Sequence, residues 1–330
     1  MIAVYVLLGL LVALVAGIVL TRGRLVPVLA AALPLPVLLA AGRVVGLLGW
    51  ALRIRRGVAL ANLATAFPEQ DERWRRRALF RFWQHLGRVV VEFLRSPALS
   101  PEDVDRLVDV DPDGYARFEA AYAEGKGAIV VTGHFGNFEL LGAIWSRRKL
   151  RVTAITKRLS RNAFNDFWLE QRRRAGLLEV PDSGSIRDIL AVLRRREILA
   201  IMIDQNMIPR RAVFAPFFGK LAATTPAPAV FADRSGAPVF LVLMHPLPGG
   251  RHRVTLDGPI PFDRTGDREA DVLAFTAKLN RLFEEHVRAE PHHWYWIHRR
   301  WKTRPPDEGS AAARAPSQRA AAGVDPAPPA

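Results

Sequence analysis

The segment AIVVTGHFGNFELLG, residues 128–142, places two residues capable of acid–base chemistry among mostly apolar ones. His134 lies two positions after Thr132, and Glu139 follows His134 by five positions. A carboxylate that accepts the N–H of an imidazole fixes its tautomer and leaves the other ring nitrogen free to take a proton from a hydroxyl. The two residues are therefore a candidate general base and its partner, although a histidine near a glutamate more often has a structural role.

The elements around these residues predict how they are positioned. Short apolar runs at Ala128–Thr132, Val152–Thr156, Leu199–Ile203 and Pro238–Met244 are typical of buried strands. Helical segments separate them, for example Phe164–Arg174 and Ile186–Arg196. Strand and helix thus alternate, which predicts an α/β fold with a mixed, mostly parallel central sheet flanked by helices.

In this fold His134 lies at the carboxyl end of a strand, where open α/β sheets bind their ligands. Gly133 permits the turn that follows the strand, and Glu139 would lie in the first turn of the next helix. Asp204 also follows a predicted strand, so its side chain could open onto the same sheet edge. For Asp204, a cap of a helix or turn and a role in binding donor or acceptor remain equal alternatives.

The first residues have the composition of a membrane segment. Residues 1–20 carry no charge over about the length that a helix needs to cross a bilayer. Because Arg22 and Arg24 follow this run and do not precede it, the pattern favours a transmembrane anchor at residues 1–24 over a cleaved signal peptide. The positive-inside rule then predicts that the rest of the chain faces the cytoplasm.

Three further regions follow the predicted anchor. Residues 25–56 form an apolar stretch interrupted by prolines and closed by the sequence RIRR, which favours an interfacial membrane-associated segment over a second span. Residues 57–304 are predicted to be the catalytic domain, with a long amphipathic helix at Glu72–Leu94. Residues 305–330 are mainly Ala, Pro and Ser with scattered charges, and we expect a disordered tail.

Composition limits the partners and the chemistry. The formal net charge of +15 and the pI of about 11.1 indicate an anionic partner such as phosphate-bearing lipid, an acidic protein or nucleic acid. The absence of cysteine excludes disulfides, a thiol nucleophile and Cys-ligated metal sites. No nucleic-acid-binding motif is recognisable, which counts against nucleic acid as the partner.

HFGNFE fits the H-x-x-x-x-(D/E) motif of glycerolipid-type acyltransferases. Its surroundings resemble the bacterial lipid A late acyltransferases, the lauroyl and myristoyl transferases, within the lysophospholipid and glycerolipid acyltransferase superfamily. The resemblance covers the chain from the mid-forties to Pro305. It rests on four blocks: RRGVALANLATAFPE at Arg55–Glu69, GHFGNFELLG at Gly133–Gly142, DQNMIPRRAVFAPFFGKLAATTPAPA at Asp204–Ala229 and WYWIHRRWKTRP at Trp294–Pro305.

The resemblance implies an acyltransferase in which His134 is the general base and Glu139 orients it, with no metal or other cofactor. It also implies that basic side chains after the second strand bind phosphate or oxyanion groups, with Arg173 the best match to the family's arginine. The segment VFAPFFG at Val213–Gly219 would belong either to the core or to an apolar wall for the acyl chain. The residues expected to bind substrate are Gly136, Asn137, Lys157, Arg158, Arg173, Asp204, Gln205 and Asn206.

The expected partners follow from the same resemblance. They are an acyl carrier protein as acyl donor, with coenzyme A as the alternative, a phosphorylated glycolipid acceptor and lipid of the inner membrane, but no nucleic acid. All three partners carry negative charge, which agrees with the basic composition. The competing hypothesis is a non-enzymatic basic protein, anchored in the membrane, that binds anionic lipid or nucleic acid.

Overall fold

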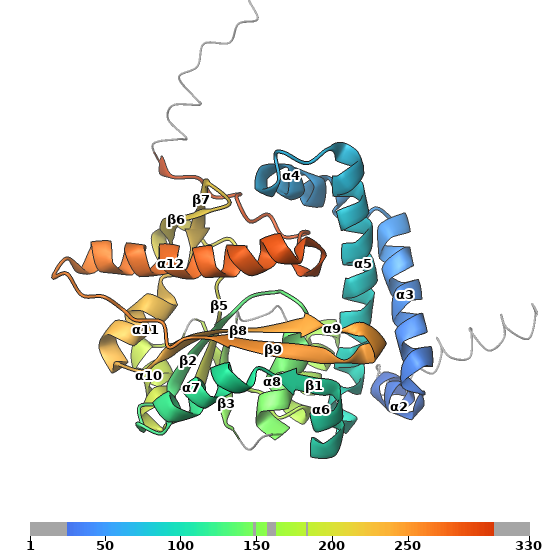
Figure 1. The fold of residues 1–330 in the computed structure, drawn as a ribbon, viewed down its shortest axis with the longest axis horizontal. Helices are drawn as coiled ribbons and strands as arrows, with labels where there is room; N and C mark the ends of the chain where they lie inside the picture. Colours follow the sequence, from blue (N-terminus) through green and yellow to red (C-terminus); the bar gives the residue numbers. More distant parts are fainter. Residues whose placement is uncertain (1–24, 148–149, 157–162, 183, 307–330) are drawn as a thin grey trace, which may run out of the picture.

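The computed structural model describes residues 25–147, 150–156, 163–182 and 184–306, which form a seven-stranded sheet with helices on both faces (Figure 1). The predicted anchor at residues 1–24, the tail from residue 307 onward, Lys157 and Arg158 lie outside the described residues. In chain order the strands of the sheet are β1 (Val108–Val110), β2 (Ala128–Thr132), β3 (Val152–Thr156), β4 (Leu178–Pro181), β5 (Ile198–Met202), β8 (Val239–Pro246) and β9 (His252–Asp257).

The strands are ordered β1-β9-β8-β2-β5-β3-β4, and every neighbouring pair is parallel except β8 with β9. The predicted mixed, mostly parallel sheet is therefore confirmed. Of the four predicted strands two have the observed bounds and two are shifted by one or two residues, whereas β1, β4 and β9 were not predicted. These three strands are short or carry polar residues, so they lack the continuous apolar run of a central strand.

Two apolar cores form because the central strands are buried on both faces. Along β8, Val239, Leu241 and Leu243 enter one core, and the alternate residues enter the other. The first core includes apolar residues of α4 (Arg56–Ala66), α5 (Glu72–Arg95), α10 (Ile186–Arg194), α11 (Ala227–Ser235) and α12 (Arg268–Ala289). The second includes residues of α6 (Pro101–Leu107), α7 (Pro112–Tyr122) and α8 (Phe138–Arg147). Figure 1 shows α12 along one side of the sheet and α7 and α8 on the other.

A separate antiparallel hairpin, β6 (Val213–Phe217) and β7 (Lys220–Thr224), contains the segment VFAPFFG. Phe217 and Phe218 are buried in the first core, where the Phe217 ring packs on Phe283 and Trp294. For these two phenylalanines the core alternative is therefore confirmed. The proposed apolar wall is not formed by these two rings, because they have almost no exposed surface left to offer an acyl chain.

The predicted interfacial segment forms two helices, α2 (Leu25–Ala32) and α3 (Leu35–Ala51), and α3 runs beside α5 (Figure 1). Gly42 and Gly46 of α3 face Gly87 and Trp83 of α5 so closely that a Cβ atom at these glycines would meet backbone atoms of the other helix.

The outward side of α3 is apolar and exposed. Among the described helices none alone is long and apolar enough to cross a bilayer; α3 and α4 together, across a bend of 92°, have the length and composition for it.

Candidate active site

His134 and Asp204 come together because β2 and β5 are parallel neighbours. Thr132 pairs with Met202 at the ends of these strands, and each side chain lies two residues further on. The His134 Nδ1–H donates to Asp204 Oδ1 over 2.9 Å, and the backbone N–H of His134 donates to Asp204 Oδ2 over 2.9 Å. The same carboxylate thus fixes both the ring and the backbone of His134.

Asp204 is a buried carboxylate with three donors. In addition to the two donors from His134, the indole Nε1–H of Trp294 donates to Oδ2 over 2.8 Å. Burial by itself raises the pKa of Asp204, but the charge and hydrogen bonds of His134 and the bond from Trp294 outweigh it and lower this pKa to about 2. Asp204 is therefore ionised at neutral pH, and it holds His134 in the tautomer whose Nε2 can accept a proton.

Glu139 does not orient His134, which corrects the predicted pairing. Its two carboxylate oxygens accept the Nε–H and an Nη2–H of Arg172 over 2.9 and 2.7 Å, and Oε1 also accepts the indole N–H of Trp168 over 2.9 Å. The side chain points from the first turn of α8 toward α9 (Ala163–Arg174). Asp204, seventy positions away in the chain, takes the role that the spacing assigned to Glu139.

Arg172, and not Arg173, pairs with Glu139, and the expectation that Arg173 binds substrate stays a prediction. The Arg173 side chain is 68% exposed and pairs with Glu170 on its own helix, whereas the Arg172 side chain is only 17% exposed. Burial lowers the pKa of Arg172, but its bonds to Glu139 and Glu179 outweigh that effect and raise the pKa above its ordinary value. Both Trp168 and Arg172 bond Glu139 because positions four apart lie on one face of a helix. This spacing is the signal by which the sequence could have singled out Arg172.

Gly136 and Asn137 hold the loop between β2 and α8 through hydrogen bonds within the protein. Gly136 has φ of +56°, its N–H donates to the carbonyl of His293, and its own carbonyl accepts from His85 Nε2. Asn137 is fully buried; it accepts the N–H of Leu140 and donates to Glu92. These contacts give both residues a structural role in the loop, and the expectation that they bind substrate stays a prediction.

Gln205 and Asn206 differ in what their side chains contact. The Gln205 amide nitrogen lies 3.0 Å from His134 Nε2. Asn206 is engaged within the protein: its side chain bonds the carbonyl of Met207 and the Thr303 hydroxyl, and its backbone N–H donates to His298 Nε2. Gln205 is thus the one of the two that touches the candidate base.

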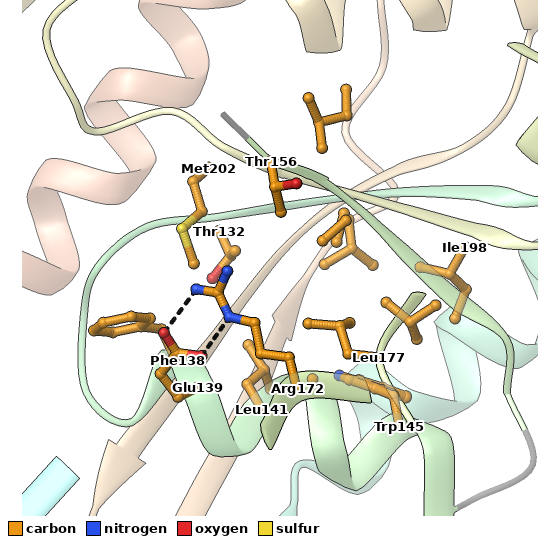
Figure 2. Close-up of a pocket in the computed structure, with 16 residues that line it drawn as sticks. Thr132, Phe138, Glu139, Leu141, Trp145, Thr156, Arg172, Leu177, Ile198 and Met202 are labelled. Carbon is orange, nitrogen blue, oxygen red and sulfur yellow. Dashed lines mark hydrogen bonds and ion pairs between the residues drawn. The ribbon is translucent and has the colours of Figure 1, made fainter. Parts of the chain in front are cut away.

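An apolar cavity adjoins this site, between α8 and α9 on one side and β2, β3 and β5 on the other (Figure 2). It encloses about 640 Å³ of empty space, counting the part that is open to solvent. At one end lie Phe138 and the Glu139–Arg172 pair; toward the other lie Trp145, Leu177 and Ile198. The Phe138 ring, which lines the cavity, also packs on His134, with centroids 4.8 Å apart. His134 itself is not among the lining residues, so Phe138 lies between the cavity and the candidate base.

The arrangement can deprotonate a hydroxyl next to an apolar chain. Within the ranges that the structure describes, no group of three or more His, Asp or Glu residues is placed to hold a metal ion. The chemistry that these residues offer is acid–base catalysis by an imidazole that a carboxylate positions, in an α/β fold whose strand ends form the site.

Comparison with known proteins identifies the family of this chain. Residues 17–303 match the family described as bacterial lipid A biosynthesis acyltransferase, and the chain belongs to that family. The lipid A biosynthesis palmitoleoyltransferase of Escherichia coli K12 is 27% identical over 282 residues, 84% of this chain and 89% of its own. The lauroyltransferase of the same strain is 25% identical over 278 residues, 83% of this chain and 88% of its own.

A relative from another kind of bacterium acts on a different glycolipid. The phosphatidylinositol mannoside acyltransferase of Mycobacterium tuberculosis H37Rv is 26% identical over 219 residues, 65% of this chain and 67% of its own. The chain is thus an acyltransferase, and the hypothesis of a non-enzymatic basic protein is set aside.

Proposed function

We propose that this enzyme transfers a fatty acyl chain from a thioester to a hydroxyl group of a lipid A precursor or a related phosphorylated glycolipid. The observation that carries the proposal is the His134–Asp204 pair at the carboxyl ends of β2 and β5, with an apolar cavity beginning at Phe138 next to it. A positioned base and an adjoining apolar cavity are what acyl transfer to a lipid hydroxyl requires.

In the proposed mechanism His134 Nε2 removes the proton of the acceptor hydroxyl as its oxygen attacks the thioester carbonyl carbon. The carbonyl becomes a tetrahedral oxyanion, the C–S bond then breaks, and the thiolate takes the proton from the imidazolium. Asp204 stabilises the imidazolium that forms between these steps, because its ionised carboxylate lies 2.9 Å from Nδ1. Asp204 thus acts as a positioning residue for His134.

The cavity is the proposed site for the acyl chain. Its walls are almost entirely apolar, and its two charged side chains, Glu139 and Arg172, pair at one end. Because Arg172 neutralises Glu139 there, no unpaired charge from this pair faces the hydrocarbon. The thioester would lie at that end beside His134, with the methyl end directed toward Trp145 and Ile198.

The proposed location is the cytoplasmic face of the inner membrane, with acyl carrier protein or coenzyme A as donor. Exposed apolar residues of α2 and α3 support membrane contact, and the net charge of +15 supports attraction to anionic lipid and to an acidic donor protein. These apolar residues include Val28, Val37, Val44 and Leu48, each at least half exposed. The anchor at residues 1–24 remains a prediction.

The direct test is transfer by the purified enzyme in detergent micelles. Acyl carrier protein or coenzyme A carrying a fatty acyl thioester is supplied with a phosphorylated lipid A precursor, and mass spectrometry detects a product heavier by one acyl chain. We expect transfer by the wild type and a loss of about 10²-fold or more in His134→Ala. Near-normal turnover in His134→Ala would exclude it as the base, and mass spectrometry of lipids from a deletion strain would identify the acceptor.

A further inference from the structure

Asp204, Phe138 and Tyr295 surround much of the His134 imidazole. Nδ1 is bound to Asp204, and the rings of Phe138 and Tyr295 pack against the imidazole with centroids 4.8 and 5.6 Å away. Only 18% of the side chain is exposed. Any hydroxyl that gives its proton to this base must therefore approach Nε2.

Nε2 is already occupied. The Gln205 side-chain nitrogen lies 3.0 Å from it, and because Nδ1–H donates to Asp204, the lone pair of Nε2 accepts an N–H from the Gln205 amide. An acceptor hydroxyl and this amide compete for the same lone pair. His134 Nε2 cannot accept the proton of a hydroxyl until its hydrogen bond from Gln205 is broken.

The backbone of Gln205 is fixed, while its side chain is held weakly. The preceding Asp204 is buried, the following Asn206 donates its N–H to His298, and the Gln205 carbonyl lies 3.5 Å from Nη1 of the buried Arg300. Within the described part of the chain, the bond to His134 is the side chain's one hydrogen bond. One neutral hydrogen bond is a weak restraint, so an incoming ligand can displace the amide by side-chain rotation.

We propose that Gln205 is a gate on the general base, which caps Nε2 of His134 until the acceptor hydroxyl displaces it and so directs the acyl group to the acceptor instead of to water. The inference rests on the proposed transfer reaction. It assigns Gln205 a part in the choice between two nucleophiles, not in the chemical step. A water molecule, with one or two hydrogen bonds and no hydrocarbon, gains less binding energy than a lipid acceptor with which to displace the amide.

The reaction that the gate suppresses is thioester hydrolysis. Water loses a proton to His134 Nε2 as its oxygen attacks the carbonyl carbon, the C–S bond breaks, and the thiolate receives the proton from the imidazolium. The products are a free fatty acid and the free thiol. The step uses the same base and thioester as transfer, so it proceeds whenever Nε2 is open to water while a donor is bound.

The experiment measures hydrolysis and transfer side by side in the full-length enzyme, with acyl carrier protein carrying a radiolabelled fatty acyl thioester as the probe. Release of fatty acid is followed without acceptor, and the ratio of hydrolysis to transfer is followed with a phosphorylated lipid A precursor. We expect Gln205→Ala and Gln205→Met to raise both the hydrolysis rate and this ratio about three- to tenfold, as for the loss of one hydrogen bond. Met matches the size of Gln without its amide, so it separates the hydrogen bond from bulk.

Three controls make the outcome decisive. Ile208→Ala, an exposed position in the same segment, should leave the ratio unchanged, and the double variant Gln205→Ala/His134→Ala should return hydrolysis to the His134→Ala level. If wild type transfers acyl chains but the ratio is unchanged or lower in both Gln205 variants, the gate is excluded and the proposed function stands. If wild type transfers nothing, the proposed function fails and the gate fails with it. A purely structural role for Gln205 would lower both rates together, which also excludes the gate.

Discussion

At the scale of single residues, the structure shows which of two carboxylates bonds His134, which the sequence alone did not show. Asp204 is bonded to His134, whereas Glu139 is bonded to Arg172 and Trp168. Asp204→Asn should lower kcat/KM by about 10²- to 10⁴-fold, because the charge that stabilises the imidazolium is lost. In a His134→Ala background Asp204→Asn should cause little further loss, since the two residues act as one unit.

Glu139→Gln provides the contrast in the same kinetic measurement. If Glu139 acts through the α8–α9 contact, its substitution should lower activity further in the His134→Ala background. If Asp204→Asn lowers activity further in the His134→Ala background and Glu139→Gln does not, the roles assigned to the two carboxylates are reversed.

The arginine run at the end of α9 permits a matched comparison of neighbours. Arg172→Ala should destabilise the protein by about 3–5 kcal/mol, because it leaves the buried Glu139 carboxylate without its ion pair. Arg173→Ala should change stability by no more than about 0.5 kcal/mol, since that side chain is exposed. Arg172→Lys should recover little, because an ammonium group cannot reproduce the two parallel bonds to Glu139. Urea unfolding monitored by circular dichroism measures the stability of all three variants. Equal small losses at both positions would contradict a buried Arg172–Glu139 ion pair.

At the scale of elements, the cavity between α8, α9 and the sheet should determine acyl chain length. A Cβ atom at Gly142 would lie 3.1 Å from Leu177 inside the lining, so Gly142→Leu should shorten the preferred chain. Trp145→Leu should lengthen it by opening the far end of the cavity. The enzyme is given a mixture of two donors whose acyl chains differ by two carbons. We expect each substitution to change the ratio of the two products about tenfold.

Ile144 is the matched control for the cavity. It is buried on the same helix but does not line the cavity, so Ile144→Ala should lower stability without changing the product ratio. Mass spectrometry of the product mixture gives the ratio for each variant. Unchanged ratios for both Gly142→Leu and Trp145→Leu would show that the acyl chain binds elsewhere.

The crossing of α3 and α5 depends on glycine. Gly46→Ala and Gly87→Ala should each destabilise the protein by about 1–3 kcal/mol, since the added methyl group would meet backbone atoms of the facing helix. Gly57→Ala is the control, because a Cβ atom there has open space, and Ala favours the helix by up to about 1 kcal/mol over Gly. Chemical unfolding of the three variants distinguishes the crossing from a general effect of glycine replacement; equal effects at all three positions would contradict a close α3–α5 contact.

At the scale of the whole molecule, apolar surface and positive charge should act together at a membrane. In a chain that lacks residues 1–20, the double variant Val44→Asp/Leu48→Asp should bind anionic vesicles much more weakly, because both side chains are exposed on α3. Leu273→Asp, an exposed apolar position on α12, should bind like the parent chain. Vesicle flotation measures binding. Raising salt from about 0.05 to 0.5 M should weaken vesicle binding of every variant by screening the net charge. Equal binding of all variants at high salt would exclude α3 as the membrane contact.

The sequence by itself determined the alternation of strands and helices and the two strand ends that carry His134 and Asp204. Those features depend on local composition: apolar runs of five to seven residues form buried strands, and the residue after such a run must lie at the carboxyl end of a strand. The tertiary structure decided which groups meet. Parallel pairing of β2 with β5 brings Asp204 to His134 across seventy positions, while the first turn of α8 directs the nearby Glu139 toward α9. It also decided between Arg172 and Arg173, because adjacent residues on a helix point about 100° apart and only packing fixes which of them faces the cavity.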